Sequence, residues 1–240
     1  SKMPSLHMVF YGPPGTGKTT VARFVGKILK SLRILKKGHT IETERADLVG
    51  RYVGWTTKET NKVIKRSLDG VLFIDEAYSL SGKGEEDFGQ EAIDTIVKKM
   101  EDYRERLVII VAGYHKEMKN FLESNAGLKS RFNRYFYFDD YKPDELMGIF
   151  LNLCKNENYE IEESARPIIL NYFEEIYKNR DKYFGNARDV RNIFENIEMK
   201  QHVRLSRSKN NIDKFLYLIT KKDVLEGIKS EKSKHILHTY

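Results

Sequence analysis

The sequence predicts an α/β domain with a five-stranded parallel sheet flanked by helices, followed by a smaller helical domain. Short apolar runs alternate with segments of helical periodicity in the first part of the chain. Two of the runs, VLFI and LVIIVA, are apolar at every position, which is typical of strands buried on both faces of a parallel sheet. After Pro143 the periodicity is predominantly helical, so a second domain is expected there.

The α/β domain is expected over residues 1–142. Its strands are predicted in LHMVFY (6–11), HTIETE (39–44), GVLFIDEA (70–77), RLVIIVAGY (106–114) and RYFYFDDY (134–141). Helices are predicted between strands over 18–32, 58–68 and 91–103, where apolar residues recur at helical spacing. This alternation predicts parallel strands joined by right-handed crossovers.

The helical domain is expected over residues 143–229. Pro143 favours a helix start, and helices are predicted over 146–154, 165–177, 187–205 and 221–227. The segment SRSKNNID (206–213) is expected to be a loop, and residues 230–240 a C-terminal tail.

Composition favours an ordinary globular protein of the cytoplasm. The chain is 40% hydrophobic, but no apolar run approaches the roughly 20 residues that a membrane helix needs. The N-terminus lacks the layout of a secretion signal, so no membrane contact is expected. Cys154 is the single cysteine, and we expect a buried small hydrophobic residue rather than a nucleophile.

The net charge of +7 is concentrated near the C-terminus, where residues 200–240 hold ten Lys or Arg against four Asp or Glu. A basic segment can bind nucleic acid or an acidic partner, but solvated charge is the commoner meaning. The sequence has no zinc-finger spacing, basic heptad region or internal repeat that would favour nucleic acid.

A phosphate-binding loop is predicted in GPPGTGKTT, directly after a strand and before a helix. Its glycines let backbone N–H groups face phosphates, and the helix N-terminus adds positive charge. Lys18 can reach the β- and γ-phosphates, and the Thr19 hydroxyl can ligate Mg²⁺. The candidate nucleotide-binding residues are Gly12, Pro13, Pro14, Gly15, Thr16, Gly17, Lys18, Thr19 and Thr20.

The acidic pair Asp75 and Glu76 supplies the matching half of the site. It follows the apolar run VLFI, and a carboxylate at the end of a neighbouring strand would lie beside the phosphate loop. Asp75 can hold Mg²⁺ through its water shell. Glu76 points differently and can orient and deprotonate the attacking water. The two motifs together predict binding and hydrolysis of a nucleoside triphosphate.

In the order of these motifs the chain resembles the AAA+ P-loop ATPases, in particular the subgroup of the SpoVK and CbbX (CfxQ) proteins. Its sequence is more similar to SpoVK than to CbbX. The matching segments lie between residues 7 and 195: HMVFYGPPGTGKTTVAR, ERADLVGRYVGWT, VLFIDEAYSL, FGQEAIDTIVKKMED, IIVAGYHKEM, GLKSRF and GNARDVRNIFE. The resemblance implies ATP and Mg²⁺ as cofactors, a helical lid, and a homo-oligomeric ring, a hexamer in this family.

The resemblance also implies roles for three arginines. Arg131 in GLKSRFNR stands at the position of the arginine finger, which reaches the γ-phosphate of the neighbouring subunit, and Arg134 is close enough to assist. A finger supplied by a neighbour makes hydrolysis depend on assembly. Arg188 in GNARDVRN matches the sensor-2 arginine, which contacts the γ-phosphate from the lid, with Arg191 as the alternative.

The sequence departs from many AAA+ proteins at sensor 1, the polar residue after the fourth strand that helps to place the attacking water. Gly113, Tyr114 and His115 stand there, as in the SpoVK and CbbX subgroup. Whether Tyr114 or His115 places the water stays open. Family members also carry a helix and linker before the first strand, so a trimmed domain or part of a longer protein is expected.

The segment RYVGW matches pore loop 1 of AAA+ rings, which the resemblance assigns to Tyr52, Val53 and Gly54. Tyr52 would grip an extended protein chain through apolar area. Gly50 and Gly54 are expected to let the loop move. Trp55 stands where the subgroup usually has a polar residue, and its role stays open.

The leading hypothesis is therefore an ATP-driven ring motor that remodels a protein threaded through its pore. The alternatives are a nucleotide-dependent DNA- or RNA-binding protein that uses the basic tail, and a nucleotide switch of low turnover. If the SpoVK resemblance is the nearer one, the target is a protein of spore formation; if the CbbX resemblance is nearer, it is an inhibited Rubisco.

Overall fold

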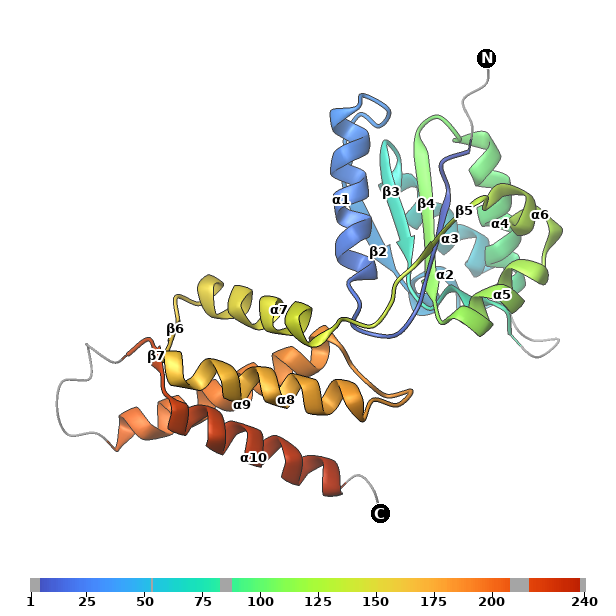
Figure 1. Ribbon diagram of the computed structural model, residues 1–240. Coiled ribbons are helices and arrows are strands. Elements are labelled where there is room, and N and C mark those ends of the chain that lie inside the picture. Colours follow the sequence, from blue (N-terminus) through green and yellow to red (C-terminus); the bar gives the residue numbers. More distant parts are fainter. Residues whose placement is uncertain (1–4, 53, 83–87, 208–215, 238–240) are drawn as a thin grey trace. The chain divides into compact units, whose positions relative to one another are not determined.

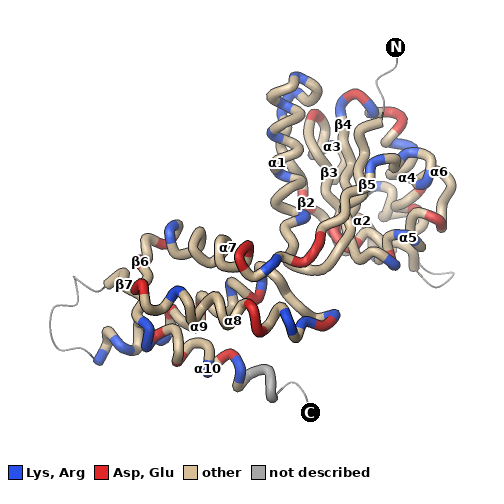
Figure 2. Tube along the Cα trace, in the orientation of Figure 1, with Lys and Arg blue, Asp and Glu red and all other residues tan. Residues whose placement is uncertain are grey.

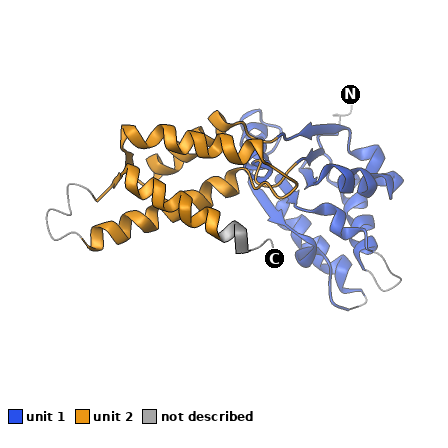
Figure 3. Cartoon of the chain, turned by 60° about the horizontal axis from the view of Figure 1, so that its bottom comes forward, with its two compact units in different colours: residues 1–12, 17–139 blue, residues 13–16, 140–240 orange. Residues whose placement is uncertain are grey.

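The computed structural model describes residues 5–52, 54–82, 88–207 and 216–237, with side chains up to 233. The chain forms two compact units (Figure 3). Unit 1 comprises Ser1–Gly12 and Gly17–Asp139, and unit 2 comprises Pro13–Thr16 and Asp140–Tyr240. Residues 13–16 therefore pack with the helical unit, although they lie within the sequence of the α/β unit.

Unit 1 contains a five-stranded sheet in the order β2-β3-β4-β1-β5, and every neighbouring pair is parallel (Figure 1). The strands are β1 (Met8–Tyr11), β2 (Thr40–Thr43), β3 (Gly70–Ile74), β4 (Leu107–Gly113) and β5 (Arg134–Tyr137). β3 and β4 are buried at every position, as their uniformly apolar sequences predict. The five-stranded parallel sheet is thus confirmed.

Helices cover both faces of the sheet, because successive side chains of a strand point to opposite sides. α1 packs on the face that carries Phe10 and Phe73, and helices α3 to α6 pack on the face that carries Val9 and Leu72. The helices of unit 1 are α1 (Lys18–Ser31), α2 (Arg45–Leu48), α3 (Trp55–Ser67), α4 (Gly89–Asp102), α5 (His115–Glu123) and α6 (Ala126–Arg131), with a 3₁₀ turn η1 at Ala77–Leu80.

Unit 2 is predominantly helical. Its elements are α7 (Pro143–Asn156), β6 (Glu160–Ile161), η2 (Glu163–Ala165), α8 (Arg166–Lys178), α9 (Ala187–Ser206), β7 (Leu218–Ile219) and α10 (Lys221–Leu237). Pro143 occupies the first turn of α7, as predicted. The core gathers Phe150, Phe173 and Phe194 from three helices, and Cys154 is buried among them.

The structure corrects three expectations about individual elements. β4 lies between β1 and β3, so the strand before Asp75 is not the immediate neighbour of β1. α3 begins at Trp55 rather than at residue 58. α10 continues to Leu237, so residues 230–237 are helical and not a tail. The buried Glu231 bonds Asn196 of α9, a tertiary contact that periodicity does not register.

Charged residues of both signs are intermixed along the helices of unit 2 (Figure 2). Arg204 bonds Asp223 at 2.9 Å, and Lys232 bonds Glu175 at 2.6 Å, so part of the C-terminal basic charge is paired within the unit. None of the helices in the described part of the chain is long and apolar enough to cross a membrane.

Candidate active site

The carboxyl edge of the parallel sheet gathers both predicted halves of the site. β1 ends at Tyr11 and leads into the phosphate loop, and β3 ends at Ile74, directly before the acidic pair. With β4 between them, the ends of β1 and β3 lie about 10 Å apart, since neighbouring strands are about 4.8 Å apart. The two motifs therefore follow strands that end at the same edge of the sheet, at a separation that a nucleoside triphosphate can span.

The segment after β1 presents positive charge at this edge. Lys18 begins α1, and its Nζ donates to Gly12 O at 3.0 Å. Thr19 is half-buried in the first turn, and Thr20 is exposed. The first turn of α1 contains no acidic residue, so the positive end of the helix dipole is not compensated there. This arrangement favours a bound anion.

Asp75 and Glu76 diverge because of the backbone at Glu76. Glu76 has φ 46° and ψ 43°, a left-handed conformation that costs a residue with a side chain about 1–3 kcal/mol. Asp75 N donates to Thr43 O at 2.9 Å, and Asp75 Oδ1 accepts from Glu76 N at 3.0 Å. Asp75 is half-buried and Glu76 is exposed. One carboxylate is thus anchored near the sheet, and the other faces solvent.

Tyr114 packs beside the segment that follows the acidic pair. Its ring is 6.2 Å from that of Tyr78, which follows Glu76 by two residues. Burial, and then the negative charge of Glu76, raises the pKa of Tyr78 to about 12, so its hydroxyl stays protonated at neutral pH. A Cβ at Gly113 would lie 2.7 Å from Tyr78 Cδ1, so glycine is required for this close packing.

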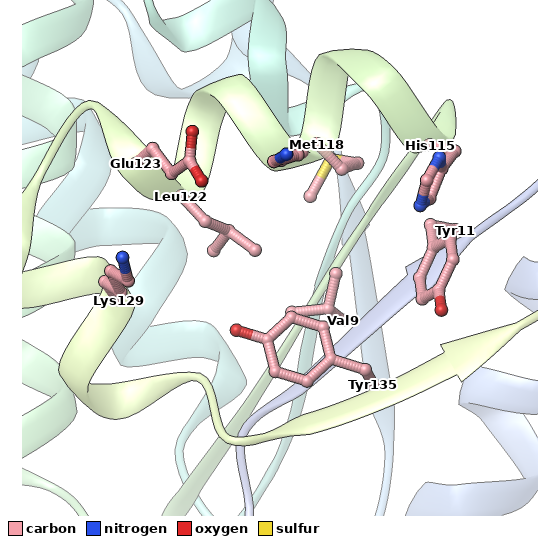
Figure 4. A pocket seen from close by; sticks show the side chains of 9 residues that line it. Val9, Tyr11, His115, Met118, Leu122, Glu123, Lys129 and Tyr135 are labelled. Carbon is pink, nitrogen blue, oxygen red and sulfur yellow. The ribbon is translucent and has the colours of Figure 1, made fainter.

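His115 points to a different place. Its ring lies 5.0 Å from that of Tyr11 and lines a cavity of about 190 Å³ on the α5 side of the sheet (Figure 4). The other lining residues are Val9, Met118, Lys119, Leu122, Glu123, Lys129 and Tyr135. Of the two sensor-1 candidates, Tyr114 is thus the one packed beside the Glu76 segment.

The two arginines of the predicted finger lie at the opposite edge of the sheet. β5 runs parallel to β1 with Met8 beside Arg134 and Tyr11 beside Tyr137, so Arg134 marks the amino edge. Its Nε donates to Ser5 O at 3.3 Å, before the start of β1. About 10 Å of strand separate this end of β1 from the end that leads into the phosphate loop.

Arg131 is held near the same amino edge. It is the last residue of α6, and its Nη2 lies 3.7 Å from Glu101 Oε2 at the end of α4. Its Nη1 donates to Gly127 O at 3.3 Å, while its buried Nε has no hydrogen-bond partner within the described residues. The structure therefore does not bring either arginine to the phosphate loop of its own chain.

In unit 2, residues 13–16 pack against the start of α9. Gly15 has φ +68°, and a Cβ there would lie 1.9 Å from Gly185 O and 3.3 Å from Arg188 N, so only glycine fits. The Arg188 backbone is thus adjacent to the phosphate loop, and its side chain is exposed. Arg191 is also exposed but lies one turn further along α9.

Two residues of this region were not predicted. Asn186 is fully buried, and its amide bonds Pro14 O at 3.1 Å, Asp140 Oδ1 at 2.8 Å and Tyr141 N at 2.8 Å. The Tyr141 hydroxyl donates to Thr16 O at 3.0 Å. An asparagine before a helix usually signals only an N-cap, yet this side chain makes no capping bond. The sequence pattern therefore gave no signal that distinguishes it.

The aromatic pair at the start of α3 is exposed. Tyr52 and Trp55 are 63% and 55% exposed, and their rings meet edge to face at 5.2 Å. Gly54 has φ +77° with open space around it. Gly50 differs from its prediction, because a Cβ there would lie 2.6 Å from Trp55 Cβ; close packing, not mobility, requires that glycine. Val53 lies outside the described residues.

Comparison with protein families gives two matches that follow each other along the chain. The ATPase family associated with various cellular activities (AAA) matches residues 8–140. The AAA lid domain matches residues 142–234. Together these ranges cover the phosphate loop, the acidic pair and the helical unit.

Similar proteins include stage V sporulation protein K of Bacillus subtilis, 45% identical over 95% of this chain and 71% of that protein. The chloroplastic ribulose bisphosphate carboxylase/oxygenase activase of Cyanidioschyzon merolae is 42% identical over 95% of this chain and 78% of that protein. Protein CbbX of Cereibacter sphaeroides is 42% identical over 84% of this chain and 65% of that protein.

Among solved structures, the FIGL-1 AAA domain in complex with ADP superposes with a TM-score of 0.63 at 20% identity, covering 95% of this chain and 72% of that one. This likeness concerns the fold alone. The family matches, the relatives and the two motifs at one edge of the sheet agree, and the chain belongs to the AAA ATPase family, in the subgroup of SpoVK and CbbX, and hydrolyses ATP.

Proposed function

We propose that the chain assembles into a closed ring, a hexamer by resemblance to its family, in which each ATP site is completed by Arg131 and Arg134 of a neighbouring subunit. The observation that carries this proposal is the placement of both arginines at the amino edge of the sheet, away from the phosphate loop. The Arg131 side chain is 30% exposed, so part of its guanidinium is accessible to another subunit, which supports the proposal.

The roles within one subunit follow from the chemistry of the side chains. Lys18 and Arg188 contact the γ-phosphate, and Glu76 deprotonates the attacking water. Tyr114 is the better candidate for placing that water, since it packs beside Tyr78 near Glu76.

The donor set also fits Mg²⁺. Thr19 and Asp75 offer hydroxyl and carboxylate oxygens, which this ion prefers, and both residues are only half-buried. Bound there, Mg²⁺ would neutralise charge on the β- and γ-phosphates. The loop residues Gly12 to Thr20 would hold the phosphates through backbone N–H groups.

The gripping element of the proposed motor is the segment of Tyr52, Val53 and Gly54, with Trp55 beside it. Two large aromatic side chains in contact and more than half exposed leave apolar area that an extended chain can cover. Such contact reads shape and apolarity rather than sequence, which suits a motor that moves along a polypeptide.

The substrate class of this proposal is protein, as the relatives suggest: one is named an activase of ribulose bisphosphate carboxylase/oxygenase, another a sporulation protein. A nucleic-acid substrate has less support, because Arg204 and Lys232 of the basic C-terminal region already form ion pairs with Asp223 and Glu175. Binding to DNA or RNA that falls steeply with salt would favour that alternative.

The ring is tested by dilution. The ATPase rate per subunit is measured over a series of protein concentrations, and the mass of the assembly is measured in parallel on Glu76→Gln with ATP bound. We expect the ATPase rate per subunit to fall at the protein concentrations where the ring dissociates. A constant rate per subunit at dilutions where only monomer exists would contradict it.

A further inference from the structure

Three successive backbone carbonyls of the phosphate loop accept hydrogen bonds from other residues of unit 2. The pairs are Asn186 Nδ2 to Pro14 O at 3.1 Å, Ala187 N to Gly15 O at 3.1 Å, and the Tyr141 hydroxyl to Thr16 O at 3.0 Å. All of these residues belong to the same compact unit. The outer side of the loop is thus bonded at three consecutive peptides.

The planarity of the peptide bond gives these contacts a consequence. In a trans peptide the C=O and the following N–H point in opposite directions. A carbonyl fixed at Pro14, Gly15 or Thr16 therefore turns the N–H of the next residue to the other side of the loop. Those N–H groups, of residues 15, 16 and 17, are the ones that a phosphate loop presents to its ligand.

We propose that Tyr141 and Asn186 are positioning residues for the nucleotide: they clamp the outer side of the phosphate loop and so aim its N–H groups at the phosphates. The inference rests on nucleotide binding at this loop and is independent of ring assembly. It gives the helical unit a part in phosphate binding that does not use the Arg188 side chain.

The Asn186 amide is locked in the orientation that the clamp needs. Tyr141 N can only donate, so the atom facing it is Oδ1, and Nδ2 must then face Pro14 O and Asp140 Oδ1. The side chain is fully buried, and its backbone has φ 54° and ψ −121°, a conformation that suits glycine better than asparagine. The presence of asparagine at this position indicates that the hydrogen bonds of its amide stabilise the loop by more than the backbone strain costs.

The approach of Gly15 adds a second observation. A Cβ at Gly15 would overlap Gly185 O at 1.9 Å, so the loop and the start of α9 meet at backbone distance. Close packing of this kind limits rotation of the Pro14–Gly15 and Gly15–Thr16 peptides, which is the motion that the clamp must prevent.

The first test is Tyr141→Phe, which removes one hydroxyl and keeps the ring. We expect about three- to tenfold weaker binding of ADP, the usual effect of one lost hydrogen bond. Inorganic pyrophosphate, which carries the phosphates alone, should lose affinity by the same factor. Both are measured by competition against a fluorescent ADP analogue, at protein concentrations where the chain is monomeric.

The matched control is Tyr135→Phe. Tyr135 also donates its hydroxyl to a backbone carbonyl, that of Phe132 at 2.9 Å, and both residues belong to unit 1. This variant loses a bond of the same kind and should bind ADP and pyrophosphate as the parent does. A comparable loss in Tyr135→Phe would show that the effect is general destabilisation and would overturn the proposal.

The second variant is Asn186→Gly, which deletes the amide and accepts the backbone conformation without strain. We expect at least tenfold weaker binding of both ligands, with little further loss when Tyr141→Phe is added, because the two residues hold one loop. Unchanged affinity in Tyr141→Phe would refute the clamp, as would a loss for ADP with none for pyrophosphate, which would place the effect at the adenosine. If Asn186→Gly does not fold, the Tyr141 and Tyr135 pair decides alone.

Discussion

Replacing Arg131 by alanine is the perturbation that most directly tests catalysis across a subunit interface. The guanidinium lies at the amino edge of the sheet, and the phosphate loop lies at the carboxyl edge of the same chain. We expect hydrolysis to slow about a thousandfold or more, the usual contribution of an arginine finger, while each subunit still binds ATP.

The effect on stability should be small by comparison. Arg131 pairs with Glu101 at 3.7 Å, and the Glu101 side chain is 60% exposed, so the ion pair contributes about 1 kcal/mol at most. In a chain of this size that corresponds to a fall in Tm of about 2–4 °C. Arg104→Ala is the matched control, because Arg104 pairs with the same Glu101 at 3.6 Å and should leave the rate unchanged.

Mixing two inactive variants gives the decisive assay. Glu76→Gln supplies an intact finger, and Arg131→Ala supplies an intact Glu76. In a randomly mixed ring of equal amounts, about one interface in four combines both intact residues, so about a quarter of the wild-type rate should return. If mixing recovers no activity although mixed rings form, Arg131 does not act on the neighbouring site.

Further predictions concern single sites. Glu76→Gln should abolish turnover while nucleotide binding persists, measured by comparing steady-state hydrolysis with retention of labelled ATP; unchanged hydrolysis would remove Glu76 from the mechanism. Tyr52→Ala should keep basal hydrolysis and lose its stimulation by a protein substrate, because we propose that the 63% exposed ring grips the substrate. Burial raises the pKa of the Cys154 thiol to about 12, so it should stay protonated and unreactive towards a thiol reagent at pH 8 until the chain is unfolded. Burial lowers the pKa of His7 to about 4 from 6.5, so the unfolded state takes up the proton first and about 2 kcal/mol of stability should be lost between pH 7 and pH 5. Ile109 N donates to His7 Nδ1 at 2.9 Å, and His7→Asn keeps an acceptor for this bond. In this variant, urea unfolding at pH 7 and pH 5 should no longer show the loss of about 2 kcal/mol in the free energy of unfolding.

Much of the fold could be predicted from local pattern. The uniformly apolar runs became β3 and β4, and Pro143 begins α7. The order of the strands could not be predicted, because hydrophobic periodicity defines faces and not neighbours. The extension of α10 was missed for a similar reason: residues 230–235 are polar, and Glu231 bonds Asn196, which lies 35 positions earlier in the chain.

The segment of Tyr52 and Trp55 was predicted only in part from the sequence. The sequence places an aromatic pair between glycines, which the resemblance assigns to a pore loop, and the structure shows that both rings are more than half exposed. Trp55 lies in the first turn of α3, and Gly50 packs directly against it. The sequence did not predict this contact, because the spacing of glycines does not show where two segments of backbone approach each other.

The phosphate loop and the Asp75–Glu76 pair could be recognised from the sequence alone, because each motif is a run of adjacent residues. The groups that surround these motifs come from distant segments, so they are known only from the folded chain. The tertiary structure placed Arg131 and Arg134 at the far edge, and it joined Tyr141 to Thr16 and Asn186 to Pro14 across 125 and 172 positions. Such bonds depend on how distant segments pack, and a hydrogen-bond donor in the sequence does not specify its acceptor.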